Sequence, residues 1–253
     1  LAIPFAELDT HAQRPLTDSE RKALSDLAET RIVTRKPLAY LLHEAWFAGL
    51  KFYVDERVLV PRSLTGEFIR ERFRPWVDAR RVRRILDLCT GSGCIAIAAA
   101  IAFPDAEVDA ADISSDALEV ARINIRQHQL MERVHPIQSD LFESLTGRRY
   151  DLIITNPPYV DRADMAALPK EYRHEPSLAL ASGELGLDAI VQILARAALH
   201  LNPEGVLARG YSIVLQDNGA VVQDAAVLNP GEKIGIRFHR GQARATVDST
   251  STD

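Results

Sequence analysis

The central part of the chain alternates short apolar runs with segments of helical hydrophobic spacing. The apolar runs predict strands at residues 85–88, 107–112, 134–140 and 150–155. Helical spacing is found at residues 94–102, 115–127 and 189–201. Strands that alternate with helices predict an α/β fold with a parallel, doubly wound sheet and right-handed crossovers. Ligands of such sheets bind at the carboxyl ends of the strands.

The pattern before residue 85 predicts a helix and then paired strands. Thr17, with Glu20 three residues later, is typical of a capping box, and helical spacing continues to about residue 34. Residues 46–54 and 58–60 look like paired strands, the second of them limited by Pro61. Residues 66–74 are predicted to form a helix that leads into the central domain.

The last part of the chain predicts two hairpins. The first runs from 206–215 through a turn at 217–219 into 220–222, and the second runs from 233–238 through 240–241 into 243–247. Residues 248–253 are polar and are expected to be disordered. The chain thus divides into an N-terminal region (1–74), a central domain (75–205) and a hairpin tail (206–253).

Composition and cysteine usage indicate a globular, intracellular chain. Of 253 residues, 47% are hydrophobic and 26% are charged, which excludes a disordered, collagen-like or disulfide-framework chain. The two cysteines, Cys89 and Cys94, favour a reducing, cytoplasmic compartment. The longest apolar run, residues 94–103, is shorter than the roughly 20 residues of a membrane span, and the pattern of the first residues leads us to expect no secretory signal.

Charge is unevenly distributed. The net charge of −5 argues against nucleic-acid binding over the whole surface. Yet residues 1–84 contain 16 Lys and Arg against 12 Asp and Glu. Within them stand seven closely spaced arginines: Arg70, Arg72, Arg74, Arg80, Arg81, Arg83 and Arg84. This run is either a solvated helix and linker or a patch that faces RNA or an RNA-rich partner.

A glycine-containing turn is predicted between the first central strand and the apolar helix. Its sequence, residues 87–93, is Asp-Leu-Cys-Thr-Gly-Ser-Gly. Glycines let the backbone approach a ligand closely, and a helix start offers free N–H groups. The pattern lacks the full spacing of dinucleotide sites, so an ordinary tight strand–helix turn remains the alternative.

Two acids end the next two strands. Asp112 is in the position of a carboxylate that accepts both hydroxyls of a ribose, or it caps the helix that starts near Ser115. Asp140 is placed to meet an adenine amino group, or it is a helix cap or a solvated acid.

The tetrapeptide Asn156-Pro157-Pro158-Tyr159 follows the fourth strand and is the most informative motif. An amide nitrogen is a poor nucleophile because its lone pair is delocalised. Two acceptors that hold its N–H groups, here the Asn156 side-chain oxygen and the Pro157 carbonyl, orient that lone pair toward an electrophile. The Tyr159 ring can pack on the planar target. The alternative is a proline-rich loop.

Together these features suggest methyl transfer from S-adenosylmethionine to a planar nitrogen. The sulfonium of that cofactor is itself the electrophile, so no metal is required. No His/Cys cluster has zinc-site spacing.

Residues 87–96 and 156–160 resemble the class I protein-(glutamine-N5) methyltransferases. Residues 45–49, 54–63 and 172–176 resemble the branch that modifies a large-subunit ribosomal protein. The resemblance covers about residues 16–205. It implies a Rossmann-like class I methyltransferase sheet and S-adenosyl-L-methionine as cofactor. The implied reaction is N5-methylation of a glutamine in a large-subunit ribosomal protein, with assembling ribosomal particles as one setting, and neither membrane nor direct DNA binding.

The motifs and the resemblance together assign candidate site residues. The catalytic candidates are Asn156, Pro157, Pro158 and Tyr159. The cofactor-binding candidates are Asp87, Cys89, Thr90, Gly91, Ser92, Gly93, Asp112, Ile113, Asp140, Leu141 and Asn156. The substrate-binding candidates are Arg62, Asn156, Tyr159 and Glu175.

Three departures from the family leave other functions open. The N-terminal helical domain is shorter than in the family, and Leu185 stands where the family has Asp. Residues after about 206 resemble the C-terminal tail of the exodeoxyribonuclease VII large subunit. The alternatives are a DNA amino-methyltransferase, against which the net charge and the short inter-motif segments argue, or a catalytically impaired hybrid that binds through its tail.

Overall fold

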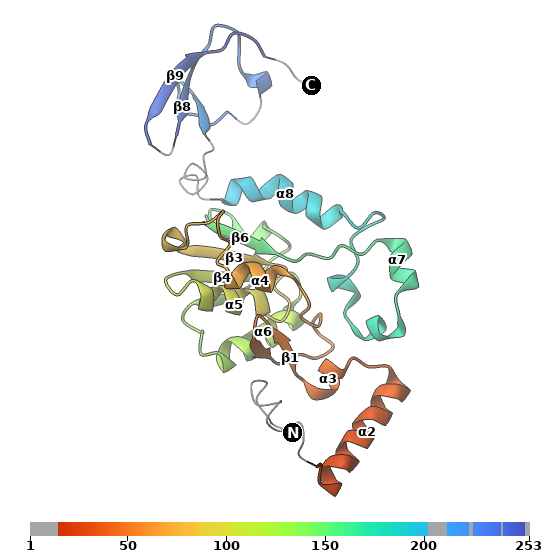
Figure 1. Cartoon of the computed structure of the whole chain (residues 1–253). Coiled ribbons are helices and arrows are strands. Elements are labelled where there is room, and N and C mark those ends of the chain that lie inside the picture. The colour runs from red at the N-terminus through yellow and green to blue at the C-terminus, as the bar shows by residue number, and fades with distance from the viewer. Residues whose placement is uncertain (1–14, 202–211, 223–224, 239, 251–253) are drawn as a thin grey trace.

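The computed structural model describes residues 15–201, 212–222, 225–238 and 240–250. Its central sheet has four parallel strands in the order β5-β4-β3-β6, as Figure 1 shows. They are β3 (Arg84–Leu88), β4 (Glu107–Asp112), β5 (Val134–Gln138) and β6 (Leu152–Thr155). The predicted parallel α/β sheet is therefore confirmed. The chain moves outward from β3 to β5 and then crosses to the other side of β3, so a ligand crevice is expected beyond the carboxyl ends of β3 and β6.

Among the helices named next, α5 and α6 pack on one face of this sheet and α8 packs on the other. The helices are α2 (Asp18–Thr34), α3 (Leu38–Leu42), α4 (Thr65–Arg70), α5 (Cys94–Ala102), α6 (Ser115–Gln127), α7 (Arg162–Ala167) and α8 (Asp188–His200). Short 3₁₀ helices lie at η2 (Ala79–Arg81), η3 (Glu143–Leu145), η4 (Lys170–His174), η5 (Ser177–Ala179) and η6 (Ala225–Val227). None of the helices in the described ranges is long and apolar enough to cross a membrane.

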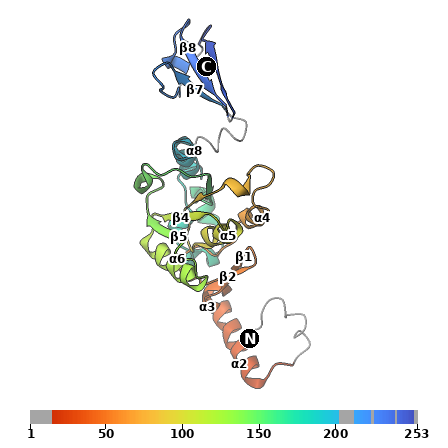
Figure 2. The same ribbon diagram turned by 90° about the vertical axis from the view of Figure 1, so that its left-hand side faces the viewer.

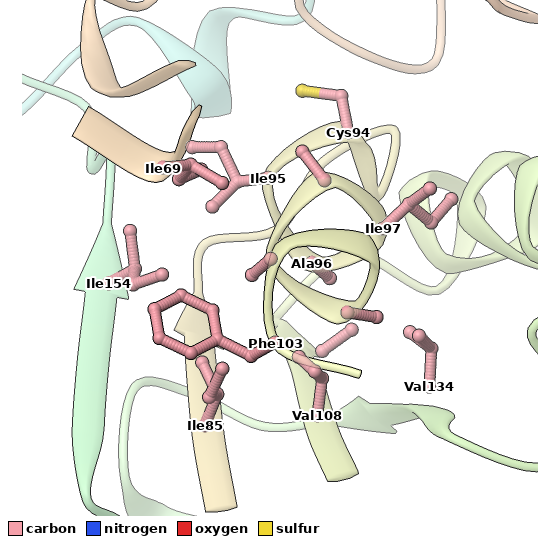
Figure 3. Close-up of a cluster of buried hydrophobic side chains, with 14 of the residues drawn as sticks. Ile69, Ile85, Cys94, Ile95, Ala96, Ile97, Phe103, Val108, Val134 and Ile154 are labelled. Atoms are coloured by element: carbon pink, nitrogen blue, oxygen red, sulfur yellow. The ribbon is translucent and has the colours of Figure 1, made fainter. Parts of the chain in front are cut away.

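Alternation along β3 separates two hydrophobic clusters. Ile85 points to the face covered by α5 and packs in the cluster of Figure 3, which includes Phe103 and Ile154. Leu86 points to the opposite face and packs in a second cluster with Ile193 of α8. Seven of the nine residues of α5 are buried, as expected for a helix that is apolar on all sides.

The N-terminal region confirms the first predicted helix but not the predicted strands. α2 has the capping box, with the Thr17 hydroxyl accepting the Glu20 N–H. Residues 46–54 do not form one strand. The chain reverses at Ala48 and Gly49, whose φ angles are 52° and 82°, and forms the hairpin β1 (Ala45–Phe47) and β2 (Leu50–Phe52).

Residues 58–60 form no strand either. The carbonyl of Val58 accepts the hydroxyl of buried Tyr40, and the Val58 side chain packs beside Val120 of α6. The helix predicted at 66–74 is shorter than expected, since α4 ends at Arg70. The segment between β2 and α4 is thus irregular backbone held against the central domain.

The C-terminal region forms a separate antiparallel sheet in the order β7-β8-β9, set apart from the central sheet in Figures 1 and 2. Its strands are β7 (Ile213–Gln216), β8 (Lys233–Arg237) and β9 (Gln242–Thr246). The second predicted hairpin is confirmed. The first is confirmed in part. Leu215 forms an antiparallel bridge with Val221, and the Gln216 and Val222 N–H groups donate to the carbonyls of Ala220 and Val214, each at 2.9 Å. Residues 220–222 do not form a full strand, and β7 also pairs with β8. The start of that hairpin, at 206–211, and the last residues of the tail, 251–253, lie outside the described residues.

Candidate functional site

A cavity of ≈ 360 Å³, called the main cavity below, lies at the carboxyl ends of β3, β4 and β6. It is lined by eleven candidates from the sequence: Arg62, Cys89, Thr90, Gly91, Ser92, Asp112, Ile113, Asp140, Leu141, Asn156 and Pro158. Five other candidates are not in its lining: Asp87, Gly93, Pro157, Tyr159 and Glu175. Segments far apart in sequence therefore converge on one concave site.

The turn after β3 has left-handed backbone at three positions. Cys89, Gly91 and Gly93 have φ angles of 62°, 55° and 79°. A Cβ added to Gly91 would meet no other atom within 4 Å, so there is open space next to the Gly91 backbone. A Cβ added to Gly93 would lie 3.2 Å from the Ala121 side chain of α6. Gly91 thus leaves room at the turn, and Gly93 permits close packing of the turn on α6.

Asp87 lies behind this turn and is fully buried. Its Oδ2 accepts the Thr90 hydroxyl at 2.5 Å and the Ala96 N–H at 2.9 Å, which fastens β3 to the turn and to α5. Burial raises the pKa of Asp87 to about 7, although the bonds from Thr90 and Ala96 oppose that rise. Its other oxygen, Oδ1, has no partner among the described residues.

Asp112 links the turn to the start of α6. Its Oδ2 accepts the Gly91 N–H at 2.8 Å and its Oδ1 accepts the Ser114 N–H at 3.0 Å. The helix cap is Ser114, whose hydroxyl accepts the Ala117 N–H, so the alternative that Asp112 caps α6 is wrong. Burial raises the pKa of the Asp112 carboxyl. Asp140 lies two residues after the end of β5 and is exposed.

The Asn156–Tyr159 motif follows β6 directly. The Thr155 hydroxyl donates to the Leu88 carbonyl at 2.7 Å, which fastens the end of β6 to the end of β3. Asn156 and Pro158 line the main cavity. Tyr159 is 59% exposed and is not part of the lining, so more than half of its surface is open to solvent.

Arg62 and Glu175 form a bidentate ion pair. Both N–O distances are 2.6 Å, and the Arg62 guanidinium also lies over the Tyr172 ring, 5.0 Å from its centroid. Hydrogen bonding to Glu175 raises the pKa of Arg62. Arg62 lines the main cavity, whereas Glu175 is buried and is not in the lining. Glu175, a substrate-binding candidate from the resemblance, thus holds the Arg62 guanidinium in place and does not itself line the cavity.

Several buried polar residues were not predicted from the sequence, among them Ser139 and Ser182 in the lining of the main cavity and Asn124 behind it. Asn124 of α6 is fully buried, and its Nδ2 donates to the carbonyls of Ser92 at 2.8 Å and Tyr53 at 3.0 Å. Its Oδ1 accepts the Tyr53 N–H at 2.7 Å. The signal was available, since an amide stands among the apolar residues Ala121 and Ile125 on the buried face of an amphipathic helix.

Comparison with known proteins identifies the family of this chain. The methyltransferase small domain model matches residues 73–172. A ribosomal protein uL3 glutamine methyltransferase of Bordetella pertussis is 51% identical over 208 residues, which is 82% of this chain and 70% of that protein. One of Neisseria gonorrhoeae, also 51% identical over 208 residues, covers 82% of this chain and 69% of that one. The chain belongs to this glutamine methyltransferase family.

The family resemblance inferred from the motifs is therefore confirmed, and the chain is an S-adenosylmethionine-dependent methyltransferase. Among solved structures, a methyltransferase from Pyrococcus furiosus has a TM-score of 0.45 at 21% identity, over 74% of this chain and 77% of that one. That similarity is too low to add a functional argument. The resemblance of the tail to exodeoxyribonuclease VII stays a prediction.

The site residues of this methyltransferase fit S-adenosylmethionine. Asp87 has a buried acceptor oxygen without a partner behind the turn, and Gly91 leaves the turn open where a side chain would occupy space. Asp112 adds a carboxylate in the lining of the main cavity, suited to sugar hydroxyls.

The two thiols of the methyltransferase are not activated as nucleophiles. Burial raises the pKa of both Cys89 and Cys94 to about 12, so both remain protonated thiols at neutral pH. They are not joined in a disulfide. In the described part of the chain, no group of three or more His, Cys, Asp or Glu side chains could hold a metal ion.

Proposed function

We propose that this chain methylates the side-chain nitrogen of a glutamine in ribosomal protein uL3, the substrate in the names of its relatives. One observation carries the proposal: the Asn156–Tyr159 motif and the turn after β3 border the same cavity. A cofactor held by the turn and an amide held by the motif would then meet inside the main cavity.

The proposed chemistry depends on two acceptors and one ring. S-adenosylmethionine supplies a methyl group on a sulfonium, which is an electrophile without any further activation. Asn156 Oδ1 and the Pro157 carbonyl accept the two N–H groups of the substrate amide and turn its nitrogen toward the methyl group. The nitrogen lone pair forms the new N–C bond while the S–C bond breaks, its electron pair stays on sulfur, and one amide proton leaves to solvent.

Cofactor binding is assigned to the residues that end β3, β4 and β5. Asp112 accepts the ribose hydroxyls, and Ile113, Asp140 and Leu141 surround the adenine. The remaining contacts come from the turn and the motif: Asp87, Cys89, Thr90, Gly91, Ser92, Gly93 and Asn156. This assignment is supported by the lining of the main cavity, and Asp87 contributes from behind the turn.

The substrate side is assigned to Tyr159, Arg62 and Glu175. Tyr159 is exposed and its ring is available to cover the glutamine amide. Arg62 faces the cavity, with its guanidinium oriented by the buried Glu175 carboxylate. Glu175 is thus a positioning residue for Arg62.

The remaining parts of the proposal concern setting and organisation. Assembling ribosomal particles are the proposed site of action, which places the protein in the cytoplasm, and no direct DNA binding is proposed. Residues 1–74, 75–205 and 206–253 are proposed as the docking region, the catalytic core and a tail. The tail, which resembles the end of the exodeoxyribonuclease VII large subunit, includes the separate β7–β9 sheet.

The experiment compares Asn156→Ala with wild type. Transfer of labelled methyl from S-adenosylmethionine to purified uL3 should be lost, while calorimetric titration should give nearly the wild-type affinity for the cofactor. The matched control is Asn218→Ala, which removes an amide from a turn of the C-terminal sheet. Full transfer activity in Asn156→Ala would eliminate the proposed amide clamp.

A further inference from the structure

A second cavity, of ≈ 370 Å³, lies at the opposite end of the central sheet from the main cavity. It is lined by Arg81, Arg83, Arg84, Gly147, Arg149 and Asp151, and is called the arginine pocket below. Arg84 begins β3 and Asp151 directly precedes β6, whereas the main cavity lies where these strands end. With a rise of about 3.3 Å per residue, the two cavities are about 15 Å apart. They share no lining residue.

Backbone carbonyls orient two guanidinium groups of the arginine pocket. Arg83 Nη1 donates to the carbonyls of Arg80 at 2.9 Å and Val82 at 3.0 Å, and Arg149 Nη1 donates to the carbonyl of Arg148 at 3.1 Å. A carbonyl fixes a guanidinium without neutralising its charge. The carboxylate of Asp105 is 4.0 Å from Arg83, and both side chains are more than half exposed, so this pair screens little.

The carboxylates near the arginine pocket are shared among several donors. Asp151 Oδ2 accepts the backbone N–H groups of Arg83 at 2.8 Å and Arg84 at 3.0 Å. The single Asp109 carboxylate serves both Arg84 at 3.4 Å and Arg148 at 2.7 Å. Positive charge therefore exceeds negative charge around this cavity.

Guanidinium groups held at fixed positions suit phosphate, because their planar N–H fork matches phosphate oxygens. The same segment extends the charge beyond the pocket: residues 70–84 contain seven arginines and two acids in a chain of net charge −5. Two exposed aromatic rings accompany it, Phe68 at 49% and Trp76 at 65%, with centroids 6.4 Å apart. Bases stack on such rings, which favours a nucleic acid over free phosphate or an acidic peptide.

We propose that the arginine pocket binds the phosphate backbone of RNA at the end of the sheet opposite to the main cavity, and that the 70–81 segment, which leads to the pocket along the chain, extends this contact. The arginines of residues 70–84 are thus interpreted as a patch that faces RNA, and not as a solvated helix and linker. The choice of RNA, rather than another nucleic acid, follows from the proposed ribosomal substrate. The RNA of an RNA-bound ribosomal protein would then be held at one end of the sheet, while the glutamine of that protein enters the main cavity at the other end.

The test measures binding of a fluorescently labelled single-stranded RNA by anisotropy, with the full chain and a salt series. The pocket variant is Arg81→Gln/Arg83→Gln/Arg149→Gln. The control variant, Arg21→Gln/Arg122→Gln/Arg162→Gln, removes the same charge from exposed ion pairs on α2, α6 and α7. The pocket variant should bind at least about tenfold more weakly, and its slope of log K against log salt should be less steep by about 2. The control should bind like wild type.

Three results with labelled RNA would overturn the inference: no RNA binding by wild type, an equal loss in both variants, or complete displacement of RNA by inorganic phosphate at millimolar concentration. Preference for duplex DNA of the same length over RNA would also overturn it. Methyl transfer to isolated uL3 is measured in parallel and should be equal in wild type and the pocket variant. Methylation of uL3 without RNA binding would refute only this inference. RNA binding without methylation of uL3 would refute only the proposed function.

Discussion

Replacement of Asn124 by alanine should destabilise the protein and weaken cofactor binding together. The Asn124 side chain makes three hydrogen bonds, to the N–H and carbonyl of Tyr53 and to the carbonyl of Ser92. It thereby connects the segment after β2, which leads into the wall of the main cavity, with the turn after β3. Loss of the amide leaves three backbone groups without this partner, in a site where the amide itself is fully buried.

The magnitude follows from those three groups. Each net hydrogen bond contributes about 1 kcal/mol, and a buried group left unsatisfied costs about 1–3 kcal/mol. Because Tyr53 is only partly buried, water can replace some of the lost bonds. We therefore expect the free energy of unfolding to fall by about 3 kcal/mol. Affinity for S-adenosylmethionine should fall as well, because the Ser92 carbonyl helps to fix the turn.

The assay is urea unfolding followed by circular dichroism, combined with calorimetric titration of S-adenosylmethionine into the folded variant. The matched control is Asn218→Ala, whose amide oxygen accepts the Ala220 N–H within an exposed turn and whose loss should cost well under about 1 kcal/mol. A loss below about 1 kcal/mol in Asn124→Ala, with unchanged cofactor affinity, would refute the reasoning.

Other predictions concern single residues around the main cavity. Burial raises the folded-state pKa of Asp87 to about 7, so between about pH 4 and 7 the folded chain holds a proton that the unfolded chain has lost. The free energy of unfolding should therefore fall as pH rises through this window, and urea unfolding of Asp87→Asn should show a flatter profile; an unchanged profile contradicts this. At Cys89, where φ is 62°, glycine should be tolerated and β-branched valine should cost about 1–2 kcal/mol by thermal unfolding; equal stability of the two variants contradicts this. Arg62→Lys keeps the charge but loses the bidentate pair with Glu175, so steady-state kinetics should show a higher KM for uL3 with unchanged cofactor affinity, and an unchanged KM would exclude this role.

The central sheet and the convergence of the site could be predicted because their signals are local. Each parallel strand is a short apolar run, and parallel strands end at a common edge. Asp112 and Asn156 could therefore be assigned to one site, because Asp112 ends β4 and Asn156 directly follows β6. The residues next to Asp112 and Asn156 in the sequence were enough for this assignment, and no tertiary contact had to be known.

The failures share a dependence on distant contacts. An apolar run continues through Ala48 and Gly49, and its pattern does not distinguish one strand from two strands joined by a tight turn. β7 pairs with β8 across an intervening segment, a choice that no local pattern encodes. Glu175 lies 113 positions from Arg62, so its place behind the guanidinium became visible only in three dimensions.

The most direct test of the proposed methylation is to locate the transferred methyl group. Purified uL3 is incubated with the full chain and S-adenosylmethionine, and the product is mapped by tandem mass spectrometry, with duplex DNA as a parallel acceptor. We predict one methyl group on the side-chain nitrogen of a glutamine in uL3 and none on DNA. Methyl incorporation into DNA, or into uL3 at a residue other than glutamine, would contradict the proposed function.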